Sequence, residues 1–127
     1  RSFKKRRKML IAKTFTFDAA HRLLNYDGKC ANLHGHTYKL QVIISGKVQK
    51  NGLVFDFVDL KSIVNKKVIS ILDHTFINNI IKQSTAENIS IWIWNQLIKQ
   101  LSLYEIRLWE SSSNFVIYKG PDKEKQK

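Results

Sequence analysis

Two long stretches of alternating apolar and polar residues constrain the fold of this chain more than any other feature. Lys13–His21 (KTFTFDAAH) places Phe, Phe, Ala and His on one parity, and alternate positions of His36–Val48 hold His, Tyr, Leu, Val and Ile. Such alternation predicts strands with one face on a core, because successive side chains of a strand point to opposite faces. We therefore expect one strand over Lys13–His21 and a second over about His36–Val48.

The middle of the chain changes to the spacing of amphipathic helices. Phe57–Leu72 repeats apolar residues every three or four positions, and Asp56 is placed to cap its first turn. A second helix is expected over Ser84–Leu101, where Ser84 and Glu87 form the capping-box pattern S-x-x-E.

Alternation returns near the C-terminus and predicts two more strands, Leu103–Glu110 and Phe115–Tyr118. The resulting order is ββααββ. Strands grouped at both ends with two helices between them predict an α+β domain, in which the helices cover one face of a four-stranded antiparallel sheet. Because the open edges of such a sheet favour pairing with another chain, we expect an oligomer in which neighbouring sheets join.

The net charge of +12 is concentrated at the N-terminus. Residues 1–8 carry six positive charges and no negative ones, whereas residues 9–120 hold 13 Lys and Arg against 8 Asp and Glu. We divide the chain into a basic N-terminal extension (1–8), one domain (9–120) and a charged C-terminal tail (121–127). This distribution disfavours nucleic-acid binding, because the charge lies mainly in a tail. A basic nucleic-acid-binding module with a structural zinc remains the alternative of another class.

The apolar runs and the cysteine count limit where the chain works. Every apolar run is interrupted well before the roughly 18 residues that a membrane-spanning helix needs, so we expect no membrane association. Cys30 is the only cysteine, which excludes an internal disulfide and suits the reducing conditions of the cytoplasm.

Three of the four histidines fall on the inward parity of the first two strands. His21 ends the first strand, and His34 and His36 enter the second. Any one of them alone is readily explained as a hydrogen-bonded core residue. Together, three converging imidazoles predict a zinc site with one open coordination position, which is the arrangement of catalytic zinc.

Cys30 lies in the loop before His34, next to Lys29. It could be a fourth zinc ligand, which would make the site closed and structural. A thiol near a cation also has its thiolate form favoured, which suits a base or a nucleophile. A buried and inert cysteine is the third possibility.

Two acidic positions complete the set of candidates. Asp73 precedes His74 at a helix end. The pair either caps the helix and is solvated there, or it forms a carboxylate–imidazole proton relay. Glu110 falls on the inward parity of the third long strand, where an unpaired carboxylate is costly to bury. A ligand that presents two adjacent N–H groups would satisfy it bidentately.

Several motifs together resemble one enzyme family. FDAAH, CANLHGH, LDHTFIN, STAENISIWIW and WESSS occur in the order and approximate spacing of the 6-pyruvoyl-tetrahydropterin synthase superfamily, over about residues 10–120. The C-x3-HGH spacing most resembles its bacterial branch, the 6-carboxy-tetrahydropterin synthases of queuosine biosynthesis. The chain departs from that branch at Thr75, where a second His is often found, and in the proline-free segment IIKQSTAE.

The resemblance implies a tunnelling fold (T-fold) and a particular assembly. In this family ββααββ subunits form trimers whose strands close a barrel, and two trimers stack into a homohexamer with active sites between subunits.

The resemblance also implies roles for individual residues. The Zn²⁺ ligands are His21, His34 and His36. The catalytic residues are Cys30, Asp73 and His74. The substrate-binding residues are Glu110, Thr85, Ala86 and Glu87.

The implied reaction converts 7,8-dihydroneopterin triphosphate into 6-carboxy-tetrahydropterin, acetaldehyde and triphosphate. This makes the chain a zinc-dependent carbon–oxygen and carbon–carbon lyase. The alternative within the family is a 6-pyruvoyl-tetrahydropterin synthase, which eliminates triphosphate and leaves the side chain uncut.

Overall fold

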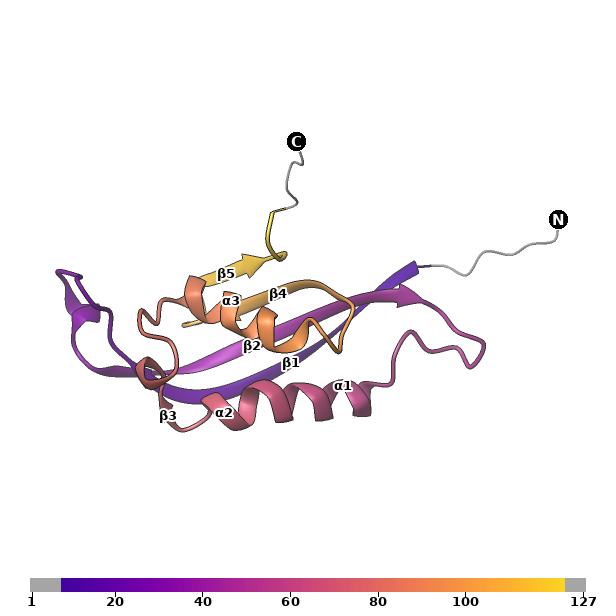
Figure 1. Ribbon diagram of the computed structural model, residues 1–127, viewed down its shortest axis with the longest axis horizontal. Helices are drawn as coiled ribbons and strands as arrows, with labels where there is room; N and C mark the ends of the chain where they lie inside the picture. Colours follow the sequence, from indigo (N-terminus) through magenta and orange to yellow (C-terminus); the bar gives the residue numbers. More distant parts are fainter. Residues whose placement is uncertain (1–7, 123–127) are drawn as a thin grey trace.

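A five-stranded sheet is the frame of the molecule, in the order β3-β1-β2-β4-β5 (Figure 1). The computed structural model describes residues 8–122, so most of the two predicted tails (1–7 and 123–127) lies outside the described residues. Lys8, which we had assigned to the N-terminal extension, is the first residue of β1.

The two longest strands form one antiparallel hairpin. β1 (Lys8–His21) pairs with β2 (His34–Lys47) along its whole length, from Lys8 opposite Lys47 to His21 opposite His34. Both strands begin earlier than predicted, because backbone pairing continues where the side chains no longer alternate between core and solvent. The predicted inward residues do form the core face, where Tyr38 and Leu40 are fully buried.

The second half of the sheet contains an irregularity that the sequence pattern missed. β4 (Leu103–Trp109) pairs with β2, and β5 (Phe115–Tyr118) pairs with β4, both antiparallel. The β2–β4 register shifts at Ile43/Ile44. The predicted inward position of Tyr104 is therefore wrong: Tyr104 is exposed and Glu105 is buried, where it accepts a hydrogen bond from Arg107 Nε.

The first predicted helix is continuous from Phe57 to Leu72 but changes its winding. It consists of α1 (Phe57–Val64), a π-helical turn (η2, Asn65–Ile69) and α2 (Ser70–Leu72). The Asp56 side chain accepts a hydrogen bond from the Val58 backbone N–H, as a capping residue does.

The second helix is shorter than predicted at both ends. α3 spans Ala86–Leu97, and its N-cap is Thr85, whose Oγ1 accepts from the backbone N–H of Asn88. Ser84 was therefore wrong as the cap. It is fully buried and takes part in the site described below.

A short strand that the sequence did not reveal closes one edge of the sheet. β3 (Thr75–Phe76) runs parallel to β1, with Thr75 opposite Ala19, and leads into the 3₁₀ turn η3 (Ile77–Asn79). Two residues are too few to show a period, so neither the strand nor the fifth position in the sheet was predictable from alternation.

Both long helical segments cover the same side of the sheet. α1 lies along β1, and α3 lies across β4 and β5, in line with the contacts between these elements (Figure 1). Apolar residues of both helices and of the inward strand positions form one core cluster. The α+β class with helices on one sheet face is confirmed. Within residues 8–122 no helix has the length and apolar character to cross a bilayer.

Candidate active site

Three imidazoles meet at the end of the β1–β2 hairpin. His21 pairs with His34 across the hairpin, and His36 projects to the same face two positions further along β2. The ring centroids are 4.6 Å apart for His21–His34, 5.0 Å for His21–His36 and 4.9 Å for His34–His36. One ring nitrogen of each lies within 4.8 Å of the others. The strand register therefore produces the convergence that parity predicted.

Backbone carbonyls fix the orientation of two of these rings. His21 Nδ1 donates to the Ser84 carbonyl and His34 Nδ1 donates to the Asn32 carbonyl, both at 2.7 Å. With Nδ1 used in this way, Nε2 is the nitrogen left for a metal. His21 Nε2 is fully buried and has no hydrogen-bond partner. An orphaned imidazole nitrogen facing two other imidazoles fits a divalent metal such as zinc.

Burial favours the metal-binding form of two of these rings, because it lowers the pKa of His21 and of His36. Desolvation lowers the pKa of His21, and the neighbouring His34 lowers it further, against an opposing effect of the Ser84 hydrogen bond. Desolvation also lowers the pKa of His36. Neutral imidazoles are metal ligands, so the site is prepared for a metal before one binds.

A polar network behind His21 was not visible in the sequence. The Ser84 hydroxyl lies 3.0 Å from Asn78 Oδ1, which also accepts from the backbone N–H of Arg22. Asn78 Nδ2 donates to the carbonyls of Arg22 and Lys82. These bonds tie the segment before α3 to the end of β1, and so hold the Ser84 carbonyl against His21.

Cys30 lies near this end of the hairpin but outside the metal cluster. It sits in the 3₁₀ turn η1 (Lys29–Ala31), and its carbonyl accepts from the backbone N–H of Leu23 at 2.8 Å. Its side chain is partly buried and its thiol is free. Among the described residues, Cys30 is not grouped with the three imidazoles.

Asp73 and His74 form a second, separate cluster with Asp18. His74 Nδ1 is 3.1 Å from Asp73 Oδ2, and the Asp18 backbone N–H donates to Asp73 Oδ1 at 2.9 Å. This backbone hydrogen bond is the main cause of the lowered pKa of Asp73, and the bond to His74 adds to it. His74 has φ 61°, a left-handed conformation that a residue other than glycine rarely adopts. Such local strain is typical of functional positions.

The two clusters occupy different faces of the sheet. Asp18 pairs with Thr37 across the hairpin and accepts its hydroxyl hydrogen bond at 2.5 Å. Both residues have the parity opposite to that of the three imidazoles, so they point to the face without helices. A groove of about 510 Å³ is lined by residues of both groups, including His36 and His74. The sequence predicted one site for all these groups, but a single chain does not bring them together in one cluster.

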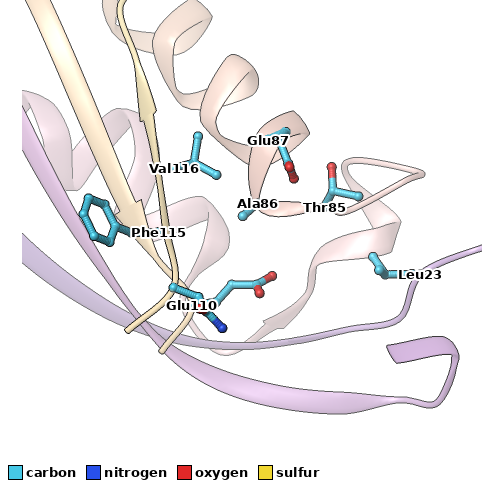
Figure 2. Close-up of a pocket in the computed structure, with 8 residues that line it drawn as sticks. Leu23, Thr85, Ala86, Glu87, Glu110, Phe115 and Val116 are labelled. Atoms are coloured by element: carbon cyan, nitrogen blue, oxygen red, sulfur yellow. The ribbon is translucent and has the colours of Figure 1, made fainter. Parts of the chain in front are cut away.

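A cavity next to the metal cluster holds the predicted substrate-binding residues. It has a volume of about 250 Å³ and lies between the β4–β5 end and the start of α3 (Figure 2). The complete lining is Leu23, Thr85, Ala86, Glu87, Glu110, Asn114, Phe115 and Val116. In Figure 2 the Glu110 carboxylate points toward Ala86 and Thr85 across the cavity.

Glu110 connects this cavity to the metal cluster. Its Oε2 is 3.9 Å from His21 Nε2, and 29% of its side chain is exposed. Tyr38 is also close to both groups: it is fully buried, and its ring lies next to those of His21 and His36. Burial and the nearby Glu110 charge raise the pKa of Tyr38, and its hydroxyl has no hydrogen-bond partner. Sequence reasoning treated Tyr38 only as a core residue.

Fold and site together define an α+β domain in which three imidazoles that fit a metal ion lie beside a cavity lined by Glu110. The family described as 6-pyruvoyl tetrahydropterin synthase matches residues 10–121. The chain therefore belongs to the 6-pyruvoyl tetrahydropterin synthase family.

Relatives of two named activities resemble the chain over most of its length. A 6-carboxy-5,6,7,8-tetrahydropterin synthase of Haemophilus influenzae is 43% identical, covering 85% of this chain and 96% of the relative. A 6-pyruvoyl tetrahydrobiopterin synthase of Dictyostelium discoideum is 36% identical, covering 90% and 98%. The structure of Caenorhabditis elegans 6-pyruvoyl tetrahydropterin synthase superposes with a TM-score of 0.85 at 27% identity, covering 94% of this chain and all of that one.

Proposed function

We propose that this protein is a zinc-dependent 6-carboxy-5,6,7,8-tetrahydropterin synthase acting on 7,8-dihydroneopterin triphosphate in queuosine biosynthesis. The observation that carries the proposal is the position of Glu110. This carboxylate lines a ligand cavity and also reaches to 3.9 Å from a metal-binding imidazole. A ligand anchored by Glu110 is therefore held next to the three imidazoles.

Glu110 supplies the recognition of the pterin ring in this proposal. A pterin presents two adjacent N–H groups, and a carboxylate accepts from both in a bidentate pair. Thr85, Ala86 and Glu87 line the opposite wall of the cavity, at the N-terminus of α3. The ring is thereby oriented so that its side chain extends toward His21, His34 and His36.

The chain's own groups then move protons at that side chain. A zinc ion on the three imidazoles would polarise the hydroxyl oxygens of the side chain and acidify the neighbouring C–H bonds. Cys30 takes or returns a proton at a side-chain carbon. His74, oriented by Asp73, carries the second proton.

The separation of Asp73–His74 from the imidazoles supports an active site shared between copies. In a homohexamer built as a dimer of trimers, a neighbouring subunit would bring its own pair to the substrate held here. The outer edge of β5 has no partner strand among the described residues, so it is available for pairing between sheets. We place this assembly in the cytoplasm, where the single thiol stays reduced.

The product identifies the reaction. Purified protein incubated with 7,8-dihydroneopterin triphosphate should release 6-carboxy-tetrahydropterin and acetaldehyde, read by mass spectrometry of the pterin and an aldehyde trap. The three-residue spacer between Cys30 and His34 underlies this expectation, because proton transfer needs reacting atoms within about 3–3.5 Å and loop length sets where the thiol lies. Accumulation of 6-pyruvoyl-tetrahydropterin without acetaldehyde would assign the chain to the other activity, which its Dictyostelium relative is named for.

A further inference from the structure

The Tyr38 hydroxyl is a buried donor without an acceptor. Only two fully buried side-chain polar atoms in residues 8–122 have no hydrogen-bond partner, His21 Nε2 and Tyr38 OH. A metal accounts for the first. The second belongs to a side chain that is completely inaccessible, and burying an unpaired hydroxyl destabilises the folded protein. An orphan of this kind calls for an explanation.

The strand register places Tyr38 between the metal cluster and Glu110. Lys39 pairs with Trp109, and one position further the same register brings Tyr38 opposite Glu110 on the inward face. On its other side Tyr38 pairs with Phe17, with the two rings stacked at 5.0 Å. Its ring also lies edge-on to His36, at 5.3 Å between centroids.

Glu110 is the charged acceptor near Tyr38, whereas His36 belongs to the three-imidazole group. The Phe17 side chain has no acceptor, and His21 uses Nδ1 as a donor to Ser84 while its Nε2 faces the other imidazoles. The Glu110 carboxylate has four lone-pair positions, and two adjacent N–H groups of a ligand would use only two of them. In the structure Glu110 is 29% exposed, so water can satisfy its remaining lone pairs. A ligand that fills the cavity removes this water, and the carboxylate then needs a donor from the protein.

We propose that Tyr38 is a positioning residue for Glu110, and that its hydroxyl donates to the Glu110 carboxylate when a pterin occupies the cavity. This inference rests on the proposed function of Glu110 as the pterin anchor. The hydroxyl holds the carboxylate with two lone pairs turned to the ligand, and both buried groups become satisfied on binding. Tyr38 thus contributes to pterin affinity without touching the pterin.

A double-mutant cycle tests the proposal with zinc-loaded protein and neopterin, followed by the change in pterin fluorescence. Tyr38→Phe removes only the hydroxyl and should weaken neopterin binding about tenfold. Zinc content and the midpoint of thermal unfolding should stay at the wild-type values, because no bond in the unliganded protein is lost. The matched control is Tyr104→Phe, at an exposed tyrosine on β4, which should bind as the wild type does.

The Glu110→Gln background separates the possible outcomes. Glu110→Gln alone should weaken binding roughly a hundredfold, because its amide N–H opposes one ligand N–H. In that background Tyr38→Phe should have no further effect. A full tenfold loss there would mean that the hydroxyl serves another acceptor, such as an oxygen at the metal cluster, and would overturn the assignment to Glu110. Wild-type affinity of Tyr38→Phe would overturn it too, whereas wild-type affinity of Glu110→Gln would refute the anchor itself.

Discussion

The two histidine-bearing clusters of this protein are built in opposite ways. His21 is 1% exposed, and its ring is oriented by a backbone carbonyl and a polar network. The His74 side chain is 78% exposed and lies 3.1 Å from Asp73, and its backbone has a left-handed conformation. The difference fits the two roles proposed for these histidines. A metal ligand must be neutral and held in place, whereas a group that carries protons to a substrate must be accessible.

Removing one imidazole should have the largest effect. We expect about one zinc per wild-type chain. His36→Ala should lose most of this zinc and nearly all turnover, because two imidazoles are too few ligands to hold the ion. Metal analysis of the purified variants measures this. His74→Ala is the matched control, since it removes an imidazole from the other cluster, and it should keep its zinc. Loss of zinc from His74→Ala would show that both clusters belong to one metal site, and the contrast between them would be wrong.

His74→Ala should instead lower kcat. The loss of a positioned acid–base group typically reduces the rate about 10²–10⁴-fold. Steady-state kinetics with 7,8-dihydroneopterin triphosphate would show kcat falling with little change in neopterin affinity. If the affinity fell and kcat were preserved, His74 would be a binding residue and the proton-relay role would be wrong.

Cys30→Ala tests whether the thiol acts in catalysis or binds the metal. Because Cys30 lies outside the three-imidazole group, the variant should retain its zinc and lose turnover to a similar extent as His74→Ala. Cys30→Ser retains a hydroxyl of similar size and serves as the conservative comparison. A metal-free Cys30→Ala protein would make the site closed and structural.

Asn78→Ala should affect only the buried cluster, and more mildly. Asn78 ties the Ser84 segment to Arg22 behind His21, and loss of such outer contacts typically weakens metal affinity about 10–100-fold. Competition with a zinc chelator would measure the change, with Asn95→Ala as a control at an exposed residue of α3. Unchanged zinc affinity would show that the Ser84 carbonyl is held without Asn78.

Deleting residues 1–7 should change neither cluster. The charge of this segment is separate from the nearly balanced body, and β1 begins at Lys8. Zinc content and turnover at fixed ionic strength should equal those of the full chain. Loss of both would contradict the proposed enzyme and favour the basic module with a structural zinc.

Alternation predicted the parts of the site that lie within long strands. His21, His34, His36 and Glu110 were placed on the inward face by parity alone, and the register brings them together there. The element types of the four long strands and of the helical segments were also predictable, because each repeats its period several times. Their boundaries were not, since caps and strand ends depend on single contacts.

The contacts that orient the site came from outside these patterns. The Ser84 carbonyl and the Asp18 backbone belong to segments 63 and 55 residues away from their partners. The register shift that leaves Tyr104 without a partner depends on how β2 and β4 fit against each other. None of these features leaves a local signal in the sequence.

By itself, the sequence determined which face of each strand is apolar and which polar residues share that face, because side-chain direction alternates with a period of two. The tertiary structure decided that the imidazoles and Asp73–His74 form two clusters instead of one. It also decided that the buried Tyr38 hydroxyl is left without a hydrogen-bond partner. Strand pairing sets both outcomes, since it brings together residues whose separation in the chain carries no information about their distance in space.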